Sequence, residues 1–145
     1  MFLFGGVKRG DGGAAKIRSV LASGALVGFA PTRDLEAARQ FYEGVLGLEL
    51  VAMTPAAVVL DANGTTVRVT LVEELAPPPY TILGWEVADV HATVRALAAR
   101  GVACERFPGL DQDDDGVWTA PSGDQVAWFK DPEGNTLSVT ELAAG

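Results

Sequence analysis

Apolar and polar residues alternate in two stretches of the chain that read almost alike. They are LDANGTTVRVTLV, which begins at Leu60, and KDPEGNTLSVTEL, which begins at Lys130. Each has an Asp, a Gly three residues later, and then a run in which every second residue is apolar. A period of two is typical of a β-strand with one buried face, and an Asp-to-Gly segment is typical of a turn. The pattern therefore predicts two similar β-hairpins.

A helical period precedes each hairpin. The apolar stripe of the first helix is Leu35, Ala38, Tyr42, Val45 and Leu46, and that of the second is Val90, Val94, Leu97 and Ala98. Asp34 and Asp89 stand where N-caps belong, and Gly47 and Gly101 stand where the helices should end. Each helix follows a short apolar strand, so each half reads as a strand, a helix and three strands.

This order predicts one domain, residues 25–145, built from two repeats. The repeats span about residues 25–73 and 80–142, and EELAPPPY is the linker between them. Residues 1–24 are rich in glycine and keep no period, so we predict a flexible N-terminal arm there.

Three segments carry a family resemblance: PTRDLEAARQFYEGVLGLEL, GWEVADVHATVRALAARGV and FKDPEGNTLSV. They resemble the vicinal oxygen chelate superfamily, the group of glyoxalases, bleomycin-resistance proteins and extradiol dioxygenases, over residues 25–142. The resemblance implies an α+β fold of two paired βαβββ units, with curled mixed sheets around a cleft and helices on the outer face. It also implies a homodimer and, in the enzymes of the family, a divalent metal held by four side chains on the cleft strands.

The positions that correspond to those metal ligands hold unsuitable residues in this chain. They are Val27, Arg68, Ile82 and Ser138. None of these side chains is a normal ligand for a hard divalent ion, and Arg68 is a fixed cation. We therefore expect no metal and no cofactor. His91, the only histidine, is expected to be a solvated side chain near the start of a helix.

Side chains that share a strand face with these positions are the candidates for ligand binding. Strand alternation adds Phe29 and Glu86 to Arg68 and Ser138 on the cleft face. Arg68 and Glu86 can pair there, or each can await a polar group of a ligand. Trp118 follows an acidic loop, and its direction is not readable, but a tryptophan beside a cleft suits stacking.

The second hairpin decides the direction of two more aromatic residues. If a four-residue turn from Asp131 to Gly134 closes it, Lys130 pairs with Asn135. Phe129 then faces the cleft and joins the ligand-binding candidates, and Trp128 faces the core. A β-bulge would reverse the two faces.

Composition and charge narrow the classes of partner. The net charge of −8 argues against nucleic acid as a partner, and no apolar run approaches the length of a membrane span. A single cysteine, Cys104, allows no internal disulfide, so we expect a cytoplasmic protein that does not bind membranes. The segment DQDDDGVWTAPS, from Asp111, matches a calcium loop only in part, because its twelfth residue is Ser122 and not Glu.

Two functions follow from these observations. The first is a metal-free small-molecule binding protein of the glyoxalase/bleomycin-resistance type, holding an organic ligand in the cleft. A cationic, antibiotic-like ligand would suit the acidic chain. The alternative is a glyoxalase-like lyase, isomerase or dioxygenase, with unrecognised metal ligands or with a metal-free mechanism that uses Glu86 as a base. The sequence identifies no catalytic residue.

Overall fold

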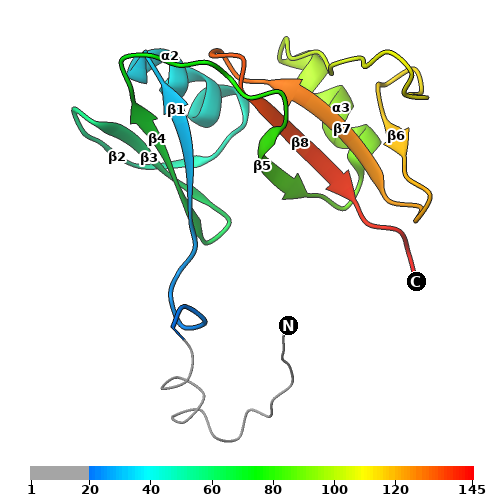
Figure 1. Ribbon diagram of the computed structural model, residues 1–145, viewed down its shortest axis with the longest axis horizontal. Coiled ribbons are helices and arrows are strands. Elements are labelled where there is room, and N and C mark those ends of the chain that lie inside the picture. Colours follow the sequence, from blue (N-terminus) through cyan, green and yellow to red (C-terminus); the bar gives the residue numbers. More distant parts are fainter. Residues whose placement is uncertain (1–19) are drawn as a thin grey trace, which may run out of the picture.

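The chain forms two four-stranded sheets, one from each predicted repeat, in a computed structural model that describes residues 20–145 (Figure 1). The first sheet has the order β1-β4-β3-β2, with β1 (Val27–Thr32), β2 (Glu49–Met53), β3 (Ala57–Ala62) and β4 (Thr65–Leu71). The second has the order β5-β8-β7-β6, with β5 (Thr81–Glu86), β6 (Trp118–Thr119), β7 (Gln125–Lys130) and β8 (Thr136–Glu141). In each sheet the first strand runs parallel to the last, and the other pairs are antiparallel. The predicted α+β fold is confirmed.

The helices begin where the sequence predicts. The carboxylates of Asp34 and Asp89 accept hydrogen bonds from backbone N–H groups three residues later, at the starts of α2 (Leu35–Arg39) and α3 (Val90–Ala99). After α2 the chain continues as the π-helix η1 (Gln40–Val45), so the prediction of a regular α-helix there is wrong. None of the helices from residue 20 onward is long and apolar enough to cross a bilayer.

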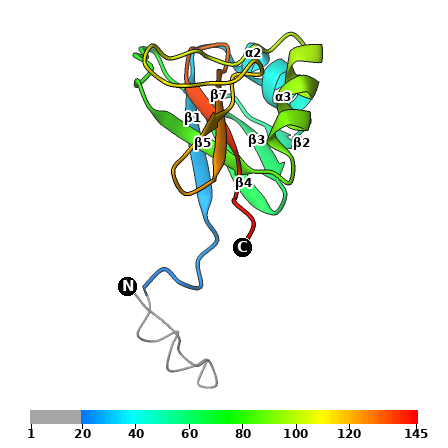
Figure 2. The same cartoon turned by 90° about the vertical axis from the view of Figure 1, so that its right-hand side faces the viewer.

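The helices and one face of each sheet enclose the hydrophobic core. Val67 and Val69 of β4 and Leu137 and Val139 of β8 are buried, as strand alternation predicts. Figure 2 shows α2 and α3 on the same side of the molecule, where they cover the two sheets. Within residues 20–145 no helix covers the other face of each sheet, and we call it the open face. Of the predicted arm, residues 1–19 lie outside the described part of the chain.

A buried polar cluster joins the two repeats within one chain. The Tyr42 hydroxyl donates a 2.7 Å hydrogen bond to Asp131 Oδ2, and burial raises the pKa of Tyr42 far above its usual value. Asn135 Nδ2 donates to the backbone oxygen of Pro31 at 3.1 Å and to Asp131 Oδ2 at 2.8 Å. We call Tyr42, Asp131 and Asn135 the joint. It connects the second hairpin turn to the helix and first strand of the other repeat.

Two further contacts hold the repeats together. The Glu133 carboxylate accepts from the backbone N–H of Arg33 at 2.7 Å and from the Thr32 hydroxyl at 3.1 Å. The Arg33 N–H is the main reason that the pKa of Glu133 lies below its usual value. Where the first strands of the repeats meet, a Cβ on Gly28 would lie 3.1 Å from Leu83 Cδ2, so this close approach favours glycine.

The second hairpin turn is one residue longer than the sequence analysis supposes. Lys130 pairs with Thr136 and not with Asn135, so five residues, 131–135, separate the two strands. The Asp131 carboxylate stabilises this turn by accepting from the backbone N–H groups of Glu133 and Asn135, each at 2.9 Å. The extra residue reverses the faces of β7. Phe129 therefore pairs with Leu137 on the core side, and Trp128 pairs with Ser138 on the open side.

Candidate functional site

The open face of the second sheet carries a row of aromatic rings. The Phe107 and Trp128 rings meet edge to face with 5.4 Å between centroids, and Trp118 lies 6.1 Å from Trp128 at a tilt of 35°. Trp128 comes from β7, Trp118 from β6, and Phe107 from the loop before the acidic segment. Three rings from three separate segments thus form one aromatic surface, in which Phe107 is exposed and the two tryptophans are half-buried.

Small and polar side chains lie beside this row on the same face. Trp128 pairs across the sheet with Ser138, which pairs in turn with Gly84. A Cβ on Gly84 would lie only 2.8 Å from Ser138 Oγ, so a larger residue at position 84 would require the Ser138 hydroxyl group to move. Because these side chains are small, they leave the surface beside the Trp128 ring free of bulky groups.

A cavity of about 170 Å³ opens at one end of the aromatic row. It is lined by Pro79, Tyr80, Thr81, Phe107, Trp128, Lys130 and Thr136. The Lys130 ammonium donates a 3.0 Å hydrogen bond to the buried Thr136 hydroxyl. Within residues 20–145 this is its one hydrogen bond, and no carboxylate lies within ion-pair distance of it. Two of the three ammonium donors are therefore free to bind a ligand.

The sequence-predicted site residues lie in three places. Trp118, Glu86 and Ser138 share the open face of the second sheet. Phe29 and Arg68 lie next to each other on the open face of the first sheet, where Phe29 is 60% exposed. The structure shows no ion pair between Arg68 and Glu86 anywhere in the described chain.

Phe129 is the one predicted site residue that the structure places in the core. It is 1% exposed, because the five-residue turn directs its ring toward α3, so the prediction that it faces the cleft is wrong. The same turn explains why the sequence analysis missed Trp128 and Lys130, which it places on the open face. The Asp131 side chain, which can accept from backbone N–H groups within a longer turn, was the sequence feature that could have indicated the positions of both residues.

The four positions that hold a metal in related enzymes do not fit one here. Val27 and Ile82 have no donor atom, Arg68 is a cation, and Ser138 offers a single hydroxyl group. Ile82 also lies where the pairing of β5 with β8 is irregular, and it packs against the core. Across residues 20–145 no group of three His, Cys, Asp or Glu side chains is arranged to hold a metal ion.

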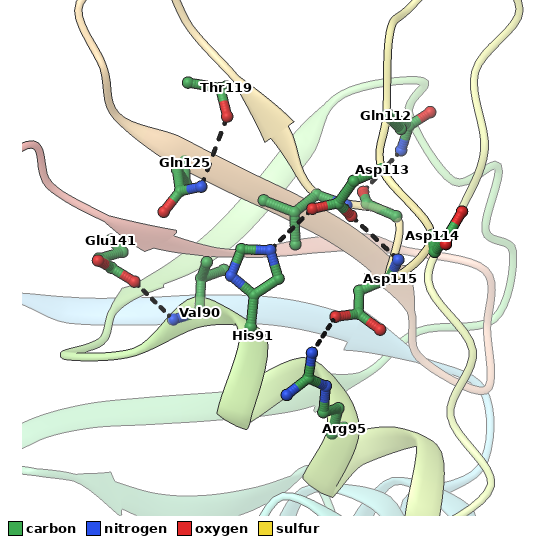
Figure 3. A network of polar contacts seen from close by, with 12 residues as sticks. Val90, His91, Arg95, Gln112, Asp113, Asp114, Asp115, Thr119, Gln125 and Glu141 are labelled. Carbon is green, nitrogen blue, oxygen red and sulfur yellow. Dashed lines mark hydrogen bonds and ion pairs between the residues drawn. The ribbon is translucent and has the colours of Figure 1, made fainter.

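The acidic loop is folded against α3 (Figure 3). His91 Nε2 lies 2.8 Å from Asp113 Oδ2, and Arg95 forms a 3.0 Å ion pair with Asp115. The other Asp113 oxygen accepts from the backbone N–H groups of Asp115 and Val117. The expectation that His91 is a free solvated side chain is therefore wrong, and two of the loop's carboxylates are used to dock it on α3.

Acid is expected to loosen this loop. Partial burial raises the pKa of Asp113, but the hydrogen bonds from His91, Val117 and Asp115 outweigh it, so the net pKa lies below the usual value. A lowered carboxyl pKa contributes stability above the usual value of about 4, and the contribution disappears as the pH falls through the lowered one. The protection of the amides of residues 111–117 against hydrogen exchange, taken relative to the intrinsic rates at each pH, should therefore fall below about pH 4 in the native protein. In Asp113→Asn this protection should already be low at neutral pH.

A second cavity lies on the helix side of the same sheet. It measures about 180 Å³ and is lined by Leu46, Leu48, Trp85, Val87, Thr93, Leu97, Phe129 and Val139. None of the described residues that line it is charged, so the lining has little to orient a polar ligand. We interpret it as a packing gap between α3 and the end of η1.

Comparison with known proteins agrees with this architecture. The family model described as Glyoxalase/Bleomycin resistance protein/Dioxygenase superfamily matches residues 25–139. No match was found among the curated proteins. A putative glyoxalase family protein from Bacillus anthracis superposes with a TM-score of 0.68 at 14% identity, covering 86% of this chain and 99% of that one. A glyoxalase/bleomycin resistance protein/dioxygenase from Nocardioides gives 0.66 at 18% identity, covering 93% and 94%.

A member of the same superfamily from Sphaerobacter thermophilus is 24% identical, with a TM-score of 0.63 over 84% of this chain and 99% of that one. At these identities each structural likeness concerns the fold alone. The family model, however, extends from the first strand of one repeat into the last strand of the other, across the joint and the open face. The chain therefore belongs to the Glyoxalase/Bleomycin resistance protein/Dioxygenase superfamily.

Proposed function

We propose that the protein is a metal-free binding protein for a small organic molecule, which it holds on the open face of the second sheet. The observation that carries this proposal is the meeting of the aromatic row with a cavity that contains the Lys130 ammonium, whose one hydrogen-bond partner among the described residues is Thr136. Aromatic walls with a few polar groups are the usual composition of a small-molecule site.

Each part of the site has a distinct role in this proposal. Trp128 borders both the aromatic row and the cavity, so it offers its ring to a ligand that enters. Tyr80, which is 65% exposed, stands at the cavity surface and can cover a bound ligand. Lys130 and Thr136 supply the directional hydrogen bonds. Flat, partly apolar ligands suit such a surface, because ring stacking adds to the burial of apolar area.

The metal-free part of the proposal rests on the chemistry of the four family positions, described above. Elemental analysis of protein purified without chelators tests it directly. We expect less than one equivalent of zinc, nickel, iron or manganese per chain. One tightly bound equivalent that is lost in Ser138→Ala would contradict the proposal.

A binding experiment tests the site itself. Trp85 lies on the helix side, so Trp85→Phe leaves Trp118 and Trp128 as the tryptophan reporters within residues 20–145. In this background we expect benzamide, a neutral ring, to quench fluorescence with a Kd on the order of 1–10 mM, as suits nine heavy atoms. Adding Trp128→Ala should weaken binding about tenfold. Undiminished binding in that variant would exclude the proposed site.

The homodimer implied by the resemblance is also part of the proposal. Large apolar side chains are exposed around the first sheet, among them Leu26, Phe29, Val51 and Met53. A second copy of the chain would cover them. Light scattering on the same protein sample should give the mass of two chains, and a single-chain mass at tens of micromolar would remove this part of the proposal.

A further inference from the structure

We infer that the ligand carries an acidic group on a single planar ring, and that Lys130 is the residue that selects the acid. This inference names a ligand class for the proposed function and rests on it. Three features of the cavity support it: its size, the state of its one charged group, and the positions of the nearest other charges.

The size of the cavity sets the number of rings. Its volume is about 170 Å³, and an apolar protein cavity of about 150 Å³ is enough to hold benzene. One six-membered ring with one small substituent therefore fits in the cavity, against the wall that Phe107 and Trp128 form together. Two fused rings would have to extend past Tyr80 into solvent, where they would lose contact with the walls.

The charged group of the cavity favours an anion. The Lys130 side chain is half-buried, and the ammonium has the Thr136 hydroxyl as its one hydrogen-bond partner in residues 20–145. A half-buried ammonium with one hydroxyl group as its partner has its lost hydration replaced only in part. A ligand carboxylate in the cavity would supply a charge-assisted hydrogen bond, which is shorter and stronger than a neutral one. The hydroxyl groups of Thr81 and Thr136 line the same space and can donate to the second carboxylate oxygen.

The positions of other charges oppose a cationic ligand in this cavity. The net charge of −8 belongs to the whole chain, but interactions between exposed charges are screened beyond about 8–10 Å at ordinary salt concentrations. The nearest fixed charge then decides, and in the cavity that charge is Lys130. Glu86 pairs with Thr140, two rows along the open face from the Lys130–Thr136 row, and it does not line the cavity. Among the described residues that line the cavity, a cationic ligand would meet an ammonium and no carboxylate.

Three probes of nearly equal shape test the charge preference: benzoate, benzamide and benzylammonium. With the full chain we expect benzoate to bind about tenfold more tightly than benzamide, which corresponds to about 1.4 kcal/mol, and benzylammonium to bind most weakly. Lys130→Gln should make the affinities for benzoate and benzamide equal, and Lys130→Arg should keep the preference for benzoate. Arg39→Gln removes a positive charge from the helix layer without touching the cavity, so it should change nothing.

The outcomes separate this inference from the proposed function. If benzamide binds as tightly as benzoate, and Trp128→Ala weakens both, the site stands and the selection of an acid is overturned. If the preference for benzoate survives in Lys130→Gln, Lys130 is not the selecting residue. If 2-naphthoate binds more tightly than benzoate, the limit to one ring is wrong. If none of these compounds binds, both the inference and the proposed function are rejected.

Discussion

Asp131→Ala is expected to lower the free energy of unfolding by about 3–5 kcal/mol, the range for leaving a buried charged network without one partner. The Asp131 carboxylate is 6% exposed and accepts from the Tyr42 hydroxyl, from Asn135 Nδ2, and from the backbone N–H groups of Glu133 and Asn135. Alanine leaves all of these donors without their acceptor inside the molecule, and each buried unpaired donor costs about 1–3 kcal/mol. Urea denaturation at neutral pH measures the loss.

The corresponding turn of the first repeat supplies the matched control. Asp61 opens that turn, but it is only half-buried, and its carboxylate accepts from the backbone N–H of Gly64 at 3.2 Å. Asp61→Ala should therefore cost only about 1 kcal/mol, the net value of one hydrogen bond. Tyr42→Phe removes the hydroxyl group that donates to Asp131. Its loss of unfolding free energy should lie between the losses for Asp61→Ala and Asp131→Ala. Equal losses in Asp61→Ala and Asp131→Ala would show that the joint adds nothing beyond an ordinary turn.

Phe129→Ala is expected to destabilise the protein by about 3–5 kcal/mol without affecting the open face directly. The Phe129 ring is 1% exposed and packs in the core that lies under α3. Trp128→Ala changes the next residue along the same strand, but its side chain is half-buried on the opposite face. We expect a smaller loss of stability from it, about 1–2 kcal/mol, since less area returns to water.

For these two neighbouring residues, the order of the effects on ligand binding should be the reverse of the order of the effects on stability. Trp128→Ala is expected to weaken benzamide binding, whereas Phe129→Ala should retain the affinity of whatever fraction of the protein remains folded. Thermal unfolding and ligand titration on the same two samples are sufficient measurements. If Phe129→Ala lost affinity while keeping its stability, the four-residue turn would be right and the assignment of the two faces would have to be exchanged.

The sequence was sufficient to predict the fold because its signals are local and occur twice. Asp34 and Asp89 cap helices that each follow the first strand of a sheet. The alternation around Val67 and Val69 identifies a buried strand face from a few residues. Each signal depends on neighbours within a few positions. Repetition in the second half supported the order of elements found in the first, whereas the pairing of the two units around a cleft was implied by the family resemblance.

The candidate site was harder to predict because it depends on contacts that are distant in sequence. A single extra residue in the turn places Trp128 and Lys130 on the face opposite to the one that a four-residue turn would give. The hydrophobic pattern does not reveal the length of the turn. Phe107 lies in a loop whose position is set by Gln112, which accepts from the Phe107 N–H and donates to the backbone oxygens of Glu105 and Gly116. No periodic pattern in the sequence predicts these hydrogen bonds within the loop.

The joint and the cavity share one short piece of chain. Lys130 and Thr136, which line the cavity, are the residues immediately before and after the five-residue turn that carries Asp131 and Asn135. A ligand that holds Lys130 and Thr136 also restrains both ends of that turn, and the turn in turn holds the other repeat. A substitution at the joint, which loosens that turn, is therefore expected to change ligand affinity without touching the ligand.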